Sequence, residues 1–177
     1  MSKGSSPYSS RTIAAGGILA AGSLVLLWMA CVAPSGRVGL AAVAGLFPVA
    51  GVLTAGRAAG YLCWAAAGIL GLVLMPDKGI ALLYLLFLGL YPVAKGQIEQ
   101  VRRRNVEWCL KLLFFNVVLT IFVFGFGKLF LPEFSQWPKI GNLGLYLGGN
   151  AVFLLYDIGL SKLIALLYHR LGAGRHR

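Results

Sequence analysis

Charged residues are scarce in this chain. Only 12% of its 177 residues are Asp, Glu, Lys or Arg, whereas 59% are hydrophobic. A soluble domain carries about 25% charged residues, so this sequence has roughly half the charged side chains that cover a water-facing globule. The shortage excludes an ordinary soluble protein of this length and indicates a chain that lies in a lipid bilayer.

Side chains that carry enzyme and metal chemistry are also few. His169 and His176 are the only histidines, and the three cysteines form no C-x-x-C pair. The sequence has no Ser-His-Asp set, no cluster with metal-ligand spacing and no phosphate-binding P-loop. We therefore expect that the chain is not an enzyme, holds no metal or cofactor, and depends on another protein for any work driven by ATP.

The hydrophobic residues lie in six runs, most of them close to the length of about 20 residues that a helix needs to cross the hydrocarbon core. Turns rich in Pro, Gly and polar residues separate them, and Pro48 is expected to kink the second run. The expected spans are residues 12–33, 38–54, 58–75, 80–94, 106–131 and 143–168. The sequence thus predicts an all-α integral membrane protein, a six-transmembrane-helix bundle over residues 12–168 with tails at 1–11 and 169–177.

The excess of positive charge fits this topology. Sixteen basic and five acidic residues give a net charge of +11, which in a soluble protein would suggest nucleic-acid binding. Here the basic residues lie mainly at the ends of the apolar runs, where they set membrane orientation, so we expect no nucleic-acid partner. Ten lie on the side of the tails and four on the other side: Lys3, Arg11, Arg57, Lys95, Arg102, Arg103, Arg104, Arg170, Arg175 and Arg177 against Arg37, Lys78, Lys128 and Lys139. This bias predicts that both termini are cytoplasmic.

Polar side chains interrupt the last two predicted spans. Asn116 and Asp157 each lie about eleven residues from the cytoplasmic end of their span, which is roughly 16 Å deep at the rise of an α-helix. Tyr146 and Asn150 are neighbours at i and i+4, and Asp157 extends this polar stripe along the sixth helix. Because a carboxylate at such depth is costly, Asp157 is expected to face protein and to have a partner, and Asn116 lies at the right depth.

Two interpretations of Asp157 remain open at this stage. It can form an internal clasp between the fifth and sixth helices, or it can contact a substrate or ion together with Tyr146, Asn150 and Asn116. Lys111 lies closer to the cytoplasmic end of its span, and its long stem could reach the membrane interface.

The first predicted helix carries small residues at a spacing of four. The pairs Gly16/Ala20 and Gly17/Ala21 each share a helix face and permit close approach of another helix. This face can pack within the chain's own bundle or dock a second membrane protein.

The stretch from Arg11 to Leu27, a basic residue followed by an Ala- and Gly-rich helix, resembles the S components of energy-coupling factor (ECF) transporters. The resemblance implies a multi-pass protein of the bacterial cytoplasmic membrane with six helices and cytoplasmic termini. It further implies an outward-facing cavity for a small, vitamin-like solute, and docking of Gly16, Gly17, Ala20 and Ala21 on a coupling subunit driven by ATPase subunits. The members that carry cobalt or nickel have a histidine after the initiator methionine, where this chain has Ser2.

These features favour the membrane-embedded substrate-binding subunit of an ECF-type ABC importer. The alternative from another class is a structural or assembly protein of the membrane without a solute site. A channel or secondary transporter is a third possibility, but no inverted repeat relates residues 12–75 to residues 80–168.

Overall fold

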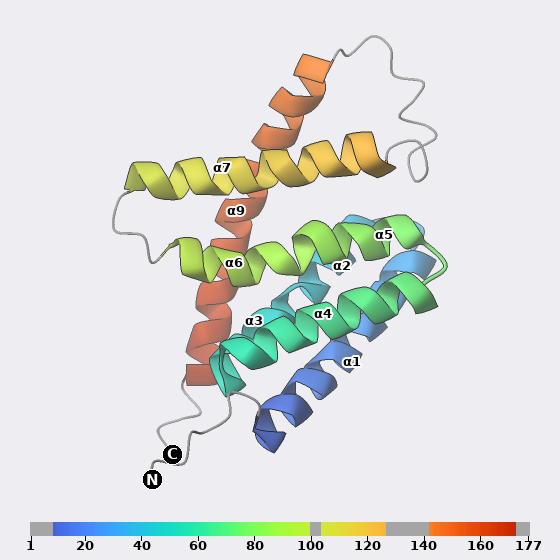
Figure 1. Ribbon diagram of the computed structural model, residues 1–177, viewed down its shortest axis with the longest axis vertical. Coiled ribbons are helices and arrows are strands. Elements are labelled where there is room, and N and C mark those ends of the chain that lie inside the picture. The colour runs from blue at the N-terminus through green and yellow to red at the C-terminus, as the bar shows by residue number, and fades with distance from the viewer. Residues whose placement is uncertain (1–8, 100–103, 127–141, 173–177) are drawn as a thin grey trace. The chain divides into compact units, whose positions relative to one another are not determined.

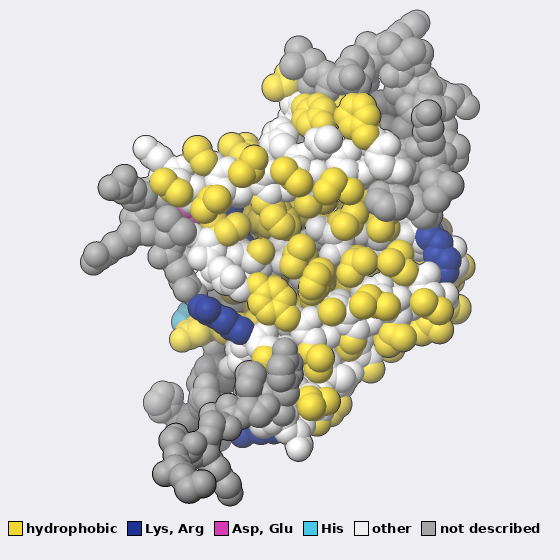
Figure 2. All heavy atoms as spheres, in the orientation of Figure 1, with side chains coloured by type: hydrophobic (Ala, Val, Ile, Leu, Met, Phe, Trp, Pro, Cys, Tyr) yellow, Lys and Arg dark blue, Asp and Glu magenta, His cyan; other side chains and the backbone are white. Residues whose placement is uncertain are grey.

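The computed structural model describes residues 9–99, 104–126 and 142–172, and every regular element in these ranges is helical. Within the described residues, six helical segments are long and apolar enough to cross a membrane: Ser10–Val32, Arg37–Ala55, Arg57–Leu74, Lys78–Ile98, Asn105–Gly125 and Gly144–His169. Hydrophobic side chains are spread over the visible face, and few Lys and Arg side chains appear on it (Figure 2). The prediction of an all-α protein with six spans is confirmed.

The chain divides into two compact units, Met1–Val93 with Leu166–Arg177, and Ala94–Ala165. The first unit holds α1 (Ser10–Val32), α2 (Arg37–Ala44), α3 (Leu46–Ala55), α4 (Arg57–Leu74), α5 (Lys78–Leu83) and the π-helical segment η1 (Tyr84–Leu88). The boundary falls inside α6 (Leu90–Ile98), and the second unit continues with α7 (Arg104–Thr120), the π-helical segment η2 (Ile121–Phe126) and most of α9 (Asn142–Gly172). Residues 127–131, the predicted end of the fifth span, lie outside the described residues.

Small residues bring the helices of the first unit together. In Figure 1, α4 runs beside both α1 and α3. A Cβ added at Gly16 would lie 2.8 Å from the Leu62 side chain, and one added at Gly51 would lie 3.2 Å from the Gly60 Cα atom. Because lipid is as apolar as leucine, close backbone contact of this kind is a main source of helix association inside a membrane.

The second span is broken at its middle, where the sequence predicts a kink. α2 ends at Ala44 and α3 begins at Leu46, with Pro48 in the first turn of α3. Pro48 has no N–H to donate to the Ala44 carbonyl, so this oxygen needs another donor. Ser23 of α1 supplies it, since its Oγ lies 3.1 Å from the Ala44 oxygen, and the Tyr84 hydroxyl donates in turn to Ser23 Oγ at 3.3 Å.

The fourth span contains the π-helical segment η1. The Gly89 N–H donates to the Tyr84 carbonyl at 2.8 Å, five residues back. In an α-helix it would donate to the Leu85 carbonyl, which therefore lacks this donor. The indole Nε1 of Trp64 in α4 donates to this Leu85 oxygen at 2.9 Å. A side chain of a neighbouring helix thus satisfies the carbonyl that the π-helical turn releases.

The fourth span continues beyond Ala94, the end predicted from the sequence, and reaches Ile98. Pro92 does not stop it because this residue lies in the first turn of α6, where a proline is tolerated. Pro92 also leaves the Leu88 carbonyl without its usual donor, and Gly45 packs so closely on this oxygen that an added Cβ would overlap it. The breaks of the second and fourth spans are therefore in direct contact.

An ion pair joins three helix ends of the first unit. Arg37 donates to the Ala30 and Cys31 carbonyls at the end of α1, at 3.2 and 3.4 Å, and to Asp77 Oδ2 at 2.5 Å. Asp77 is the N-cap of α5, and its Oδ1 accepts the N–H groups of Gly79 and Ile80. The end of α1 and the starts of α2 and α5 therefore lie at one end of this unit, as alternating spans require.

Candidate functional site in the second unit

Three polar pairs join α7 to α9 along the length of the two helices. From one end to the other they are Lys111 with Asp157, Asn116 with Asn150, and Thr120 with Tyr146. The residue numbers rise along α7 as they fall along α9, so the two helices run antiparallel. Between the first two pairs, the rings of Phe115 and Phe153 stack with centroids 4.6 Å apart.

The middle pair is a reciprocal contact of two amides. Asn116 Nδ2 donates to Asn150 Oδ1 at 3.1 Å, and Asn150 Nδ2 donates to Asn116 Oδ1 at 3.2 Å. Each amide also donates to a carbonyl of its own helix four residues back, Leu112 and Tyr146 respectively, at 2.7 Å. Both amide groups are therefore hydrogen-bonded without water, as a membrane span requires.

The third pair borders a shallow open depression. Thr120 Oγ1 lies 2.7 Å from the Tyr146 hydroxyl and donates to the Asn116 carbonyl at 2.7 Å. The depression has a volume of about 290 Å³ and is lined by Asn116, Val117, Thr120 and Ile121. Thr120 is not among the site residues predicted from the sequence, although its spacing of four from Asn116 places both on one helix face.

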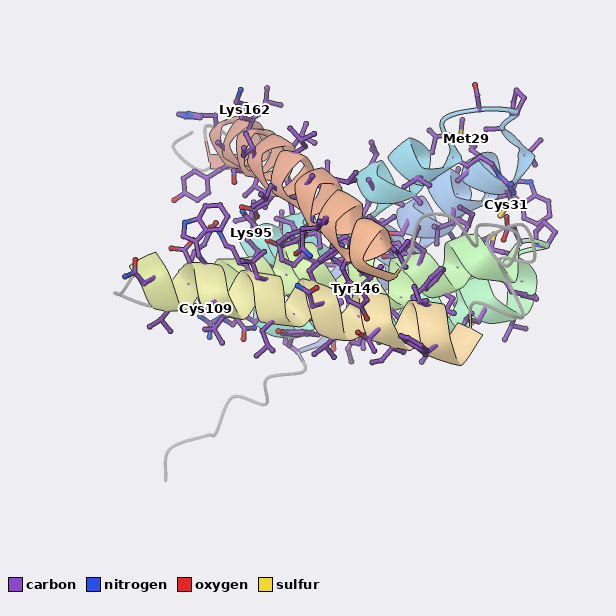
Figure 3. All side chains as sticks on the ribbon, turned by 90° about the horizontal axis from the view of Figure 1, so that it is seen from above. Met29, Cys31, Lys95, Cys109, Tyr146 and Lys162 are labelled. Atoms are coloured by element: carbon purple, nitrogen blue, oxygen red, sulfur yellow. The ribbon has the colours of Figure 1, made fainter. Side chains whose placement is uncertain are left out.

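A cluster of ion pairs surrounds the first pair. Lys95 Nζ contacts Asp157 Oδ1 and lies 2.9 Å from Glu99 Oε1. Lys111 Nζ lies 3.4 Å from Asp157 Oδ2, 3.0 Å from Glu99 Oε1 and 2.6 Å from Glu107 Oε1. Figure 3 shows the Lys95 side chain between α7 and α9. These five residues, here called the ion-pair cluster, include three of the five acidic residues of the whole chain.

The ion-pair cluster corrects three sequence-based expectations. Asp157 has the expected protein partner, but the partners are Lys95 and Lys111, while Asn116 pairs with Asn150. The ammonium of Lys111 does not stand free in solvent, since it is held in ion pairs and only 3% of its side chain is exposed. Lys95 is not a loop residue, because it lies within the fourth span and is 1% exposed.

The physical reason is the cost of an isolated charge. A buried carboxylate without a partner destabilises a protein by about 3–5 kcal/mol, so Asp157 draws in the ammonium groups within its reach. Two signals in the sequence could have located the cluster: Lys95/Glu99 and Glu107/Lys111 are both opposite charges at i and i+4. The contacts agree with the clasp interpretation of Asp157 and extend it to the fourth span, while a contact with a solute stays a prediction.

The small residues of α1 separate into two sets. Gly16 and Ala20 are buried in the packed face of α1, as the internal-packing interpretation expects. Gly17 and Ala21 are exposed, and a Cβ added at Gly17 would meet no atom within 4 Å. Of the four residues of the predicted docking face, only Gly17 and Ala21 are accessible on this unit.

Among the described residues, no group of three or more His, Cys, Asp or Glu side chains is placed to hold a metal ion. Comparisons of the chain with known protein families, with curated proteins and with solved structures find no match. The length and composition of its helices make the chain a multi-pass membrane protein. Three polar pairs lie in the interface of its last two spans.

Proposed function

We propose that this chain is the membrane-embedded binding subunit of an ECF-type importer for a small, vitamin-like solute in the bacterial cytoplasmic membrane. The observation that carries the proposal is the polar edge formed by Asn116, Thr120, Tyr146 and Asn150 inside two spans, beside an open depression of about 290 Å³. Polar residues inside a membrane are expensive and commonly mark the path of a solute or ion.

Solute binding would use groups that now bind each other. The mutual bonds of Asn116 and Asn150 can be exchanged for bonds to an amide or ring nitrogen of a solute, and the hydroxyls of Thr120 and Tyr146 can do the same for a solute hydroxyl. Because a solute donor or acceptor replaces each lost partner, the exchange leaves no polar group of this edge unpaired. Asp157 then serves as a clasp for Lys95 and Lys111 and not as the main solute contact.

Docking on a coupling subunit would use the exposed side of α1. Gly17 and Ala21 are one turn apart on this side and allow close approach of a second helix. The proposal assigns ATP hydrolysis to separate ATPase subunits and assigns no enzyme activity to this chain.

The alternative, a structural or assembly protein without a solute site, is favoured by a different observation. The side-chain N–H groups of Asn116 and Asn150 already have protein acceptors. A satisfied pair of this kind can have a purely structural role, which is to hold α7 against α9.

Copurification separates these two functions. The tagged chain is purified from its native host in mild detergent, and the proteins that accompany it are identified by mass spectrometry. Recovery of a coupling subunit and ATPases supports the importer, and their absence under conditions that retain a known S component overturns it. The variant Gly17→Leu/Ala21→Leu should lose the partners, whereas Ile18→Leu, an exposed neighbour on α1, should keep them.

The solute site is tested separately. Native mass spectrometry of the purified chain detects a bound small molecule, and the solute is then titrated against variants. Asn150→Leu should lower the affinity at least about 10-fold, the effect of losing roughly 1.4 kcal/mol of hydrogen bonding. Val152→Leu, an exposed apolar position on the same helix, is the matched control. Unchanged affinity in a folded Asn150→Leu protein would remove the site from this edge.

A further inference from the structure

The two amides of the polar edge donate all of their hydrogens within the protein. Asn116 Nδ2 lies 2.7 Å from the Leu112 carbonyl, and Asn150 Nδ2 lies at the same distance from the Tyr146 carbonyl. Because a backbone carbonyl can only accept, the amide atom beside it is the nitrogen in each case. This fixes the orientation of both amides, and the second hydrogen of each nitrogen is donated to the oxygen of the other amide.

The same reasoning gives a direction to the two hydroxyls. Thr120 Oγ1 lies 2.7 Å from the Asn116 carbonyl, which can only accept, so the single hydroxyl hydrogen of Thr120 points to this oxygen. The Tyr146 hydroxyl lies 2.7 Å from Thr120 Oγ1 and is therefore the donor of that pair. No donor hydrogen of these described side chains is left for a solute.

The oxygens of the polar edge keep acceptor capacity. An amide oxygen has two lone pairs, and a hydroxyl oxygen accepts as well as donates. The hydroxyl oxygen of Tyr146 accepts no hydrogen bond from the described residues and is half-buried. It lies beside Thr120, which lines the depression of about 290 Å³. The edge therefore offers an acceptor to whatever occupies this depression.

We propose that the polar edge binds solutes through a hydrogen-bond donor, an N–H or O–H group that points to the hydroxyl oxygen of Tyr146. This inference rests on the proposed solute site and names its substrate class, small molecules with an amide, a ring N–H or a hydroxyl. Such a solute adds a hydrogen bond while the existing ones stay. A solute that only accepts must take a hydrogen from its protein acceptor, so one hydrogen bond is lost for each one gained.

Matched pairs of small compounds test this preference. Benzamide, benzimidazole and benzyl alcohol each carry a donor, whereas N,N-dimethylbenzamide, N-methylbenzimidazole and benzyl methyl ether carry methyl groups in its place. Binding to the full chain in lipid nanodiscs is measured by ligand-observed NMR, and the signal of empty nanodiscs is subtracted. At least one donor compound should bind at least about 3-fold more tightly than its methylated counterpart, which is the effect of one neutral hydrogen bond.

The variant Thr120→Val separates hydrogen bonding from the bulk of the methyl group. It is close to isosteric and removes the acceptor of the Tyr146 hydroxyl, which can then donate its hydrogen to a solute. The methylated compounds keep their acceptor atoms, so they should bind this variant at least about 3-fold more tightly than they bind the native chain.

A second variant assigns the preference to one hydroxyl. Tyr146→Phe removes the acceptor oxygen and should give each donor compound the affinity of its methylated counterpart. Tyr168→Phe, the same substitution at an exposed position of α9, is the matched control and should retain the preference of the native chain.

The proposal is overturned if no donor compound binds, or if every donor compound that binds has the affinity of its methylated counterpart. It is also overturned if Thr120→Val does not tighten the binding of the methylated compounds, or if Tyr146→Phe retains the preference. The solute site itself is decided by the effect of Asn150→Leu on the affinity of the copurified solute, so the two failures are distinguishable.

Discussion

The hydroxyl of Ser23 illustrates how much one small side chain can do inside a membrane. It donates to the Ala44 carbonyl that Pro48 leaves free, and it accepts the Tyr84 hydroxyl. Its side chain is fully buried, so water cannot replace either hydrogen bond. Ser23 therefore links α1, the broken second span and the π-helical segment of the fourth span.

Removal of this hydroxyl should measurably destabilise the protein. Ser23→Ala leaves a buried carbonyl without a donor and the Tyr84 hydroxyl without its acceptor, so we expect a loss of about 1–3 kcal/mol in the free energy of unfolding. Thermal unfolding of the purified protein in detergent measures the change. The matched control is Thr54→Ala, whose exposed hydroxyl donates only to the Ala50 carbonyl of its own helix and should contribute less than about 0.5 kcal/mol. Equal effects of the two substitutions would contradict this account of Ser23.

Asp157 shows that a single residue can predict the need for a partner but not which residue the partner is. Its depth required a protein partner, and the structure supplies two. The identity of those partners depended on where the fourth helix ends. The fourth span predicted from the sequence ends at Ala94, one residue before Lys95, so Asn116 and not Lys95 is the polar partner that the sequence offers at this depth.

At the scale of elements, the two broken spans meet where each has lost a regular hydrogen bond. Gly45 lies on the Leu88 carbonyl, and only a residue without a side chain permits this approach. The released Ala44 and Leu85 carbonyls are satisfied by Ser23 and Trp64 from neighbouring helices. The breaks are thus specified by the surrounding helices as well as by the two prolines.

A methyl group at Gly45 should disrupt this contact. Gly45→Ala places a Cβ onto backbone atoms that cannot rotate away, so the free energy of unfolding should fall by at least about 2 kcal/mol. Gly39→Ala, in α2 of the same span and with no atom near the new Cβ, should be neutral or stabilising by up to about 1 kcal/mol. Thermal unfolding of both variants in one detergent compares them directly. A Gly45→Ala protein as stable as Gly39→Ala would show that the backbone can separate here without loss.

The elements also divide into those that the sequence could and could not predict. Apolar length and turn residues located all six spans, and Pro48 located the break in the second one. The π-helical turn at Tyr84–Leu88 was not predicted, because it depends on the indole of Trp64 and the approach of Gly45, both distant in sequence. The polar stripe of the sixth helix was identified, but its division into an amide pair and an ion pair follows from the register of α7 against α9.

At the scale of the whole molecule, the few charges follow two rules. Most basic residues lie at span ends, as membrane orientation requires, whereas Lys95 and Lys111 lie inside spans and neutralise carboxylates. Removing Lys95 from the cytoplasmic set leaves nine basic residues against four, so the predicted orientation is unchanged. The paired lysines cannot contribute to orientation in the same way, since their charge is balanced locally.

This orientation can be measured with single cysteines in a background without Cys31, Cys63 and Cys109. Ser35, in the turn before α2, should face the outside, and Gln97, near the end of the fourth span, should face the cytoplasm; both are exposed. A membrane-impermeant maleimide added to intact cells should therefore label Ser35→Cys, and should label Gln97→Cys only after permeabilisation. The reverse pattern would place both tails outside the cell and would contradict the orientation predicted from nine basic residues against four. Three spans separate residues 35 and 97, so the six-span topology places them on opposite sides of the membrane. Labelling of both positions in intact cells would contradict that topology.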